Sequence, residues 1–178
     1  MIACLRPLFI LCLAGLLAAC ASQSSSTLGE LPRTPQASIE QLLQQAAESP
    51  TEQAAALRLS ATDLAYKQKD LARASSILEQ VQLESLKPAQ QIYASTLRAE
   101  LDMRHNKPKA ALRALSHPSM ERLGELPVEQ QVRSQLVRAN ALQATGQTLA
   151  AARERAYIAP LLSGASASQN HEAIWTLV

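Results

Sequence analysis

The sequence contains few aromatic residues, few glycines and little cysteine. Its 178 residues include one Trp, three Tyr, one Phe, five Gly and three Cys. No stretch alternates Val, Ile or Thr with polar residues, so a β-sheet is not expected. A small wall-degrading enzyme is also disfavoured, because the sugar-binding cleft of such an enzyme would be lined by aromatic side chains.

Strong charge and catalytic motifs are missing as well. The chain has 17 Lys and Arg against 15 Asp and Glu and no basic stripe, which argues against nucleic-acid binding. It has no GxSxG, SxxK or HExxH motif and no glycine-rich phosphate loop. His105, His117 and His171 lack a second His or Cys at metal-ligand spacing. We therefore expect surface histidines, no catalytic residue, no metal, no cofactor and no enzyme activity.

The N-terminus has the features of a bacterial lipoprotein signal. Arg6 precedes an apolar run at 7–17, which is shorter than the roughly 20 residues that span a bilayer. Leu-Ala-Ala precedes Cys20, as in a lipobox, so residues 1–19 are predicted to be removed and Cys20 to carry acyl chains. Ala21, in place of Asp, favours the periplasmic side of the outer membrane. The alternative is an ordinary signal with an incidental cysteine.

Residues 20–36 are predicted to form the lipidated Cys20 and a flexible tether, because they are rich in Ser with Gly and Pro and show no apolar periodicity. The mature chain would keep Cys20 alone, so no intramolecular disulfide can form. Residues 37–178 are long enough for one domain.

This body has a helical composition, rich in Ala, Leu, Gln, Glu and Arg. Capping boxes are expected at Ser38 with Gln41, and at Ser49 with Glu52 and Pro50 at the first helical position. The predicted helices are 38–48, 50–68, 70–81, 88–105, 108–116, 127–145, 147–162 and 169–178.

Internal repeats determine the expected architecture. Three predicted turns lie at Lys69, Asn106 and Gly146, and small residues recur around them, at Ala74, at Ala99 and Ala111, and at Ala139 and Ala151. A long helix, a tight turn and a second helix with small residues at their crossing are typical of tetratricopeptide (TPR) repeats. We predict an all-α fold, a TPR-like antiparallel helical-pair solenoid of about three units. A plain helical bundle is the alternative.

A solenoid would have a concave face formed by the first helix of each unit, and such faces commonly bind partners. By analogy with TPR proteins, the candidate partner-binding residues are Asp63, Tyr66, Lys67, Tyr93, Glu100, Met103, Arg133, Asn140 and Gln143.

The C-terminal segment RERAYIAPLLSGASASQNHEAIWTLV (153–178) resembles the end of the N-terminal domain of the penicillin-binding-protein activator LpoA (LppC) family. The shared features are Pro-Leu-Leu at 160–162 and Gln-Asn followed by an acidic-x-x-Trp helix ending at Trp175. Residues 64–78 are similar to the first repeat of that family, and the resemblance covers about residues 38–178.

The resemblance implies an outer-membrane lipoprotein that regulates peptidoglycan synthesis. Its partner would be a class A penicillin-binding protein, the bifunctional peptidoglycan synthase, and the activator would have no catalysis of its own. Family members carry a further C-terminal domain that resembles periplasmic substrate-binding proteins, which is expected beyond Val178. This chain, which is expected to stop inside a helix, would then be the N-terminal helical arm.

The same sequence features are also compatible with one alternative function. A stand-alone TPR lipoprotein adaptor for outer-membrane protein or pilus assembly would share the lipobox and the solenoid.

Overall fold

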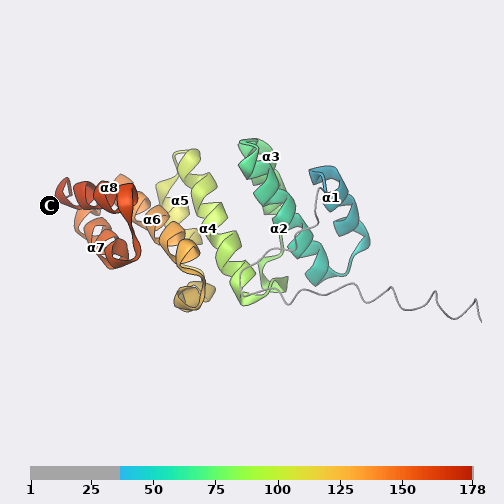
Figure 1. Cartoon of the computed structure of the whole chain (residues 1–178). Helices are drawn as coiled ribbons and strands as arrows, with labels where there is room; N and C mark the ends of the chain where they lie inside the picture. Colours follow the sequence, from blue (N-terminus) through green and yellow to red (C-terminus); the bar gives the residue numbers. More distant parts are fainter. Residues whose placement is uncertain (1–36, 178) are drawn as a thin grey trace, which may run out of the picture.

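The computed structural model describes residues 37–177, which form a row of antiparallel helices without a β-strand (Figure 1). The α-helices are α1 (Ile39–Glu48), α2 (Thr51–Lys67), α3 (Leu71–Glu79), α4 (Pro88–Arg104), α5 (Pro108–Ala114), α6 (Val128–Ala144), α7 (Thr148–Ile158) and α8 (Gly164–Trp175). Short 3₁₀ helices, η1 (Leu83–Ser85), η2 (Pro118–Glu125) and η3 (Ala159–Leu161), occupy connections. The all-α prediction is confirmed.

Three helical pairs form the body of the row. The pairs are α2 with α3, α4 with α5, and α6 with α7, and the first helices also pack against one another, α2 on α4 and α4 on α6. α1 packs against α2 at one end, and α8 packs against α7 at the other, as Figure 1 shows. The fold is therefore the predicted TPR-like solenoid of helical pairs with an additional helix at each end.

All three predicted turns have the same backbone conformation. Lys69, Asn106 and Gly146 have φ values of 65°, 56° and 80°, in the left-handed region that ends many helices. In each turn the next residue donates its N–H to a carbonyl five residues earlier, with N···O distances of 3.0, 2.8 and 2.9 Å. This is the Schellman pattern, which satisfies carbonyls that the end of a helix leaves without partners.

The left-handed turns give a stability prediction. Gly146→Ala is expected to destabilise the fold by about 1–2 kcal/mol, because an L-residue with a Cβ is strained at positive φ, although nothing lies within 4 Å of the added atom. Lys69→Gly is expected to stabilise the fold by about 0.5–1 kcal/mol, since relief of strain exceeds the added unfolded-state entropy. Urea unfolding measures both changes, and equal effects of the two substitutions would contradict this explanation.

The small residues of the repeats are fully enclosed. Ala74, Ala99, Ala111, Ala139 and Ala151 each have 0% exposure. Ala99 of α4 and Ala111 of α5 belong to one cluster with Leu115 and with Ala141 of α6. Small side chains at these positions let neighbouring helix backbones approach closely, as the repeat pattern predicted.

One predicted capping box is confirmed and the other is wrong. The Ser38 N–H donates to Oε1 of Gln41 at 2.8 Å, and the Gln41 N–H donates to Oγ of Ser38 at 3.2 Å. Ser49 instead donates its hydroxyl to the Gln45 carbonyl at 2.7 Å, so it caps the C-terminus of α1. Pro50 is the N-cap of α2 rather than its first helical residue.

α1 is joined to α3 by an exposed ion pair. Arg73 donates to Glu40 at 2.6 Å. This hydrogen bond, with help from the Glu40 backbone and Ser38, lowers the pKa of Glu40 to about 2.

The lowered pKa of Glu40 predicts a pH-dependent contribution to stability. The contribution should be complete above the ordinary Glu pKa of about 4.3 and should disappear as the pH falls toward 2, because the unfolded chain takes up the proton first. Glu40→Gln should therefore lower the urea midpoint at pH 7 and change it little at pH 2. Glu48→Gln, an exposed position on the same helix, is the control. A Glu40→Gln effect that is equal at both pH values would contradict the prediction.

The helices near the C-terminus differ from the prediction. α7 ends at Ile158 instead of continuing to 162, because Pro160 has no N–H to donate to the Ala156 carbonyl. α8 begins at Gly164, five residues before the predicted start, and ends at Trp175 instead of running to 178. The N–H groups of Thr176 and Leu177 turn back to carbonyls of α8. The expectation that residues 169–178 form one uninterrupted helix is therefore wrong.

Candidate binding face and inter-unit polar network

Residues of the predicted partner-binding face occupy repeated positions in the three units. Asp63, Glu100 and Asn140 each lie six residues before the left-handed turn residue of their unit, and Tyr93 and Arg133 lie thirteen residues before theirs. Because α2, α4 and α6 pack side by side, these positions can meet across unit boundaries. They do so in a continuous set of contacts among Lys67, Asp63, Tyr93, Arg133 and Glu100, called here the inter-unit network.

The first half of the network joins α2 to α4. The Tyr93 hydroxyl donates to the carboxylate of Asp63, which is 8% exposed. Lys67 reaches the second oxygen of the same carboxylate at 2.7 Å. A buried carboxylate is costly unless it is paired and hydrogen-bonded, and these two donors satisfy that requirement.

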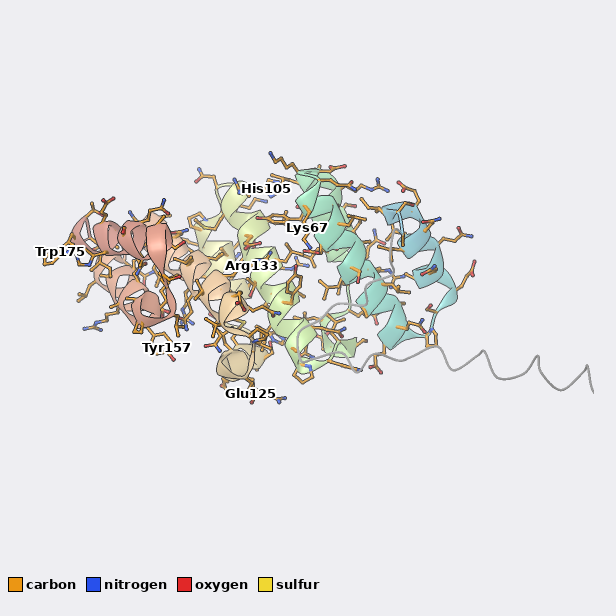
Figure 2. The ribbon with its side chains drawn as sticks, viewed as in Figure 1. Lys67, His105, Glu125, Arg133, Tyr157 and Trp175 are labelled. Carbon is orange, nitrogen blue, oxygen red and sulfur yellow. The ribbon has the colours of Figure 1, made fainter. Side chains whose placement is uncertain are left out.

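The second half joins α4 to α6. Arg133 donates from Nε and Nη2 to the two carboxylate oxygens of Glu100, at 2.7 and 2.6 Å. The same guanidinium lies 5.0 Å from the centroid of the Tyr93 ring, within the range of a cation–π contact. Figure 2 shows Lys67 and Arg133 in the middle of the helical row. The network therefore continues from α2 to α6 without a break.

Burial and charge in the network shift the pKa values of Tyr93 and Arg133. Burial raises the pKa of the Tyr93 hydroxyl, and the hydrogen bond to Asp63 raises it further, against the opposing charge of Arg133. Burial disfavours the charged Arg133, but its hydrogen bonds and attraction to Glu100 outweigh that cost and raise its pKa. At neutral pH Tyr93 is uncharged and Arg133 is cationic.

Four of the predicted face residues lie outside this network. Tyr66 and Met103 are half-buried and pack against apolar clusters of the core. Asn140 accepts a hydrogen bond at 2.6 Å from Arg155 of α7. Gln143 is exposed. The structure thus joins five of the nine predicted residues in the network and places the other four in separate environments. A role of these nine residues in binding a partner stays a prediction.

Polar residues near the C-terminus escaped the sequence analysis. Asn170 of α8, which is 4% exposed, donates to the Arg155 carbonyl at 2.9 Å and links α8 to α7. The Gln-Asn pair at 169–170 contributes to the family resemblance, but no sequence pattern predicts that Asn170 is buried. Its helical position and the burial of Asn170 depend on how α8 folds back onto α7.

The described residues offer little for catalysis. Residues 37–177 contain no cluster of His, Cys, Asp and Glu that could hold a metal ion. His105 and His171 are exposed, as predicted, whereas His117 is half-buried and its Nδ1 accepts from the N–H of Ser119 at 3.2 Å. His117 and Ser119 also approach through Nδ1 and Oγ at 2.8 Å, but His117 is the N-cap of η2 and no carboxylate orients its ring. We interpret this pair as a helix cap.

The lipidation residue Cys20 lies outside the described residues. Within 37–177, the helices are too short or too polar for any of them to cross a bilayer.

A family model described as "LppC putative lipoprotein" matches residues 32–178. Two crystal structures of LpoA from Haemophilus influenzae have similar folds, one of a monoclinic form with two molecules per asymmetric unit and one of the full-length protein. Both are 17% identical to this chain with a TM-score of 0.51, and each match covers 83% of this chain.

The matches cover 27% and 26% of the two LpoA chains, so this chain spans about a quarter of their length. At 17% identity the structural similarity is evidence for the fold alone. The evidence for the family relationship is the family model, which matches residues 32–178. The comparison with curated proteins finds no match.

Proposed function

The chain belongs to the LppC family of putative lipoproteins, and we propose that it is an outer-membrane lipoprotein that regulates peptidoglycan synthesis by activating a class A penicillin-binding protein. The family match over residues 32–178 is the observation that carries this proposal. In this view the chain is a regulator and does no chemistry itself.

The proposed domain organisation gives each segment a mechanical role. Residues 1–19 would direct export and be removed, Cys20 would hold the protein at the periplasmic side of the outer membrane, and residues 20–36 would form the tether. The helical domain would act as an arm, and a domain resembling periplasmic binding proteins would follow it in the complete protein. Tethering raises the local concentration of the activator near the cell wall. Encounters between the activator and the synthase would therefore be more frequent.

The inter-unit network supports the role of an arm. It joins three successive helical units by charged and aromatic contacts, from Lys67 to Arg133. A solenoid whose units contact only their neighbours depends on such interfaces for its cooperativity. Lys67, at one end of the network, is exposed and would remain accessible to a partner.

The anchor can be tested separately from activation. Cys20→Ser is expected to abolish incorporation of radiolabelled palmitate and to release the protein from the outer-membrane fraction, because the acyl chains would be attached to this cysteine, the only one in residues 20–178. Cys12→Ser, inside the predicted signal, is the control and should leave labelling unchanged. Continued labelling of the Cys20→Ser chain would disprove the anchor.

The activation proposal is tested in a strain that depends on the class A synthase. Deleting the gene should stop growth, and the intact gene should restore it. In a purified system, the complete gene product should bind the synthase and increase the rate of glycan-strand polymerisation. Normal growth of the deletion strain would reject synthase activation. If the protein bound a component of outer-membrane assembly and did not bind the synthase, the alternative function as a TPR lipoprotein adaptor would be favoured.

A further inference from the structure

A cavity lies between the first two helical units, on residues that the inter-unit network does not use. It has a volume of about 320 Å³ and is formed by side chains of α3, η1, α4 and α5 and the residues that follow α3 and α5. Its apolar wall consists of Leu78, Val81, Leu83, Ala94 and Ala114. The volume lies at the lower end of the range for small-molecule sites, about 300–1,000 Å³.

A buried hydroxyl without a partner lies in the wall of this cavity. Ser95 is 3% exposed, and its Oγ has no hydrogen-bond partner among the described residues. Buried polar groups are nearly always hydrogen-bonded, and an exception calls for an explanation. Thr96, the next residue, shows the usual arrangement, since its hydroxyl bonds to Ile92 and Ser134. The Oγ has almost no accessible surface in the free protein, so a ligand would supply the missing partner as the wall of the cavity shifts slightly around it.

The charged groups around the cavity are all of one sign. Arg98 and Arg113 line it, and both are exposed at its rim. One Arg98 N–H is held by the Leu78 carbonyl at 3.0 Å, which leaves its other donors free. Arg113 forms no ion pair within the described part of the chain. No Asp or Glu lines the cavity.

His117 also lines the cavity. Its Nδ1 accepts the N–H of Ser119, so the neutral ring carries its proton on Nε2. The cavity therefore combines hydrogen-bond donors and positive charge with an apolar wall. A neighbouring cavity that shares Leu78 and Arg98 differs, because Glu79 and Asp102 also line it and would repel an anion.

We propose that the cavity between the first two units binds a carboxylate carried on a short apolar body, such as the C-terminal residue of a peptide. Arg98 and Arg113 would hold the carboxylate, which guanidinium groups bind in bidentate geometry. The apolar wall would hold the side chain, and Ser95 would donate to or accept from the polar backbone of the ligand. The apolar wall disfavours a bare inorganic anion, which has nothing to place against it.

A matched pair of small molecules tests the proposal. N-acetyl-leucine and N-acetyl-leucinamide share one apolar body and differ in the negative charge. Titration of the full chain in detergent micelles, followed by backbone NMR shifts, should place acetyl-leucine at Ser95 and Arg113. The acid should bind about tenfold more tightly than the amide, as expected for charge-assisted hydrogen bonds. Equal affinities, or no shifts at the cavity, would overturn the proposal.

Two matched substitutions separate this site from general electrostatic attraction. Arg113→Gln should weaken acetyl-leucine binding about tenfold, whereas Arg104→Gln, which removes the same charge from an exposed position outside the cavity, should leave it unchanged. Equal weakening by both would mean that net charge alone attracts the ligand, and the site would be rejected.

Substitution of Ser95 tests the site independently of the arginines. Ser95→Ala should weaken binding severalfold without lowering the urea midpoint of the free protein, because the hydroxyl has no partner to lose. Ser134→Ala should lower the midpoint, since its hydroxyl is bonded to Thr96. If Ser95→Ala left acetyl-leucine binding unchanged, the hydroxyl would have no part in the site and this geometry would be wrong.

The source of the carboxylate is distinguished by a third probe, acetyl-Ala-Ala-Leu. Tighter binding of this peptide than of acetyl-leucine would identify a peptide C-terminus as the ligand. Equal binding would identify a free small carboxylate of the same chemistry.

Discussion

Ala151→Leu is expected to destabilise the fold by about 1–3 kcal/mol, because three additional heavy atoms must enter a tightly packed crossing. Ala151 is 0% exposed on α7, which packs against α6. The added atoms would push the helix backbones apart at the point where the repeat requires their closest approach. The measurement is the free energy of unfolding from urea titration of the full chain.

Ala156→Leu is the matched control for this substitution. Ala156 lies on the same helix and is exposed, so the same added atoms meet solvent and the expected change is within about 0.5 kcal/mol. A similar loss at both positions would show that leucine disturbs α7 by itself and that close helix approach is not the reason for alanine at 151.

Removing one partner of the Glu100–Arg133 pair is expected to cost about 2 kcal/mol of folding free energy. Glu100→Leu would leave a guanidinium, whose side chain is 31% exposed, without its carboxylate. Arg133→Met would leave the 13% exposed side chain of Glu100 without its bidentate donor. The double variant should be less destabilised than the sum of the two single variants, because it leaves no charge unpaired.

A double-mutant cycle by urea unfolding measures this coupling. Arg122 and Glu125 provide the control, since they form a bidentate pair of similar geometry on the surface of η2, with side chains 49% and 51% exposed. Their removal should change stability little, because water and salt screen an exposed pair. Additive effects at Glu100 and Arg133 would mean that the network does not join the second and third units.

The turns were predictable because their requirements are local. In each of the three helical pairs the first helix ends with a left-handed residue, and these residues are Lys69, Asn106 and Gly146. The enclosed alanines were predictable too, since their spacing from the turns repeats. The capping of α2 was not, because the Ser49 hydroxyl could bond forward or backward and only the formed helix α1 offered the Gln45 carbonyl.

The end of α7 and the start of α8 could not be predicted accurately from local sequence either. Pro160 gave a local signal for the end of α7 that the apolar residues around it obscured. The Ser- and Ala-rich start of α8 gives no strong signal, and its helix is fixed by Asn170 on the Arg155 carbonyl. Tertiary contact overrides weak propensity in such a segment.

The sequence by itself determined the helical class, the three units and the residues that line their first helices, because these follow from composition and from the spacing of small and turn residues. It could not pair Asp63 with Tyr93 or Glu100 with Arg133, which lie 30 and 33 positions apart. Nor could it bring Ser95 and Arg98 of α4 to the same cavity as Arg113 of α5. Those neighbours were decided by the tertiary structure alone, because the offset and rotation between successive helical pairs bring the side chains together, and that geometry arises only when the pairs pack.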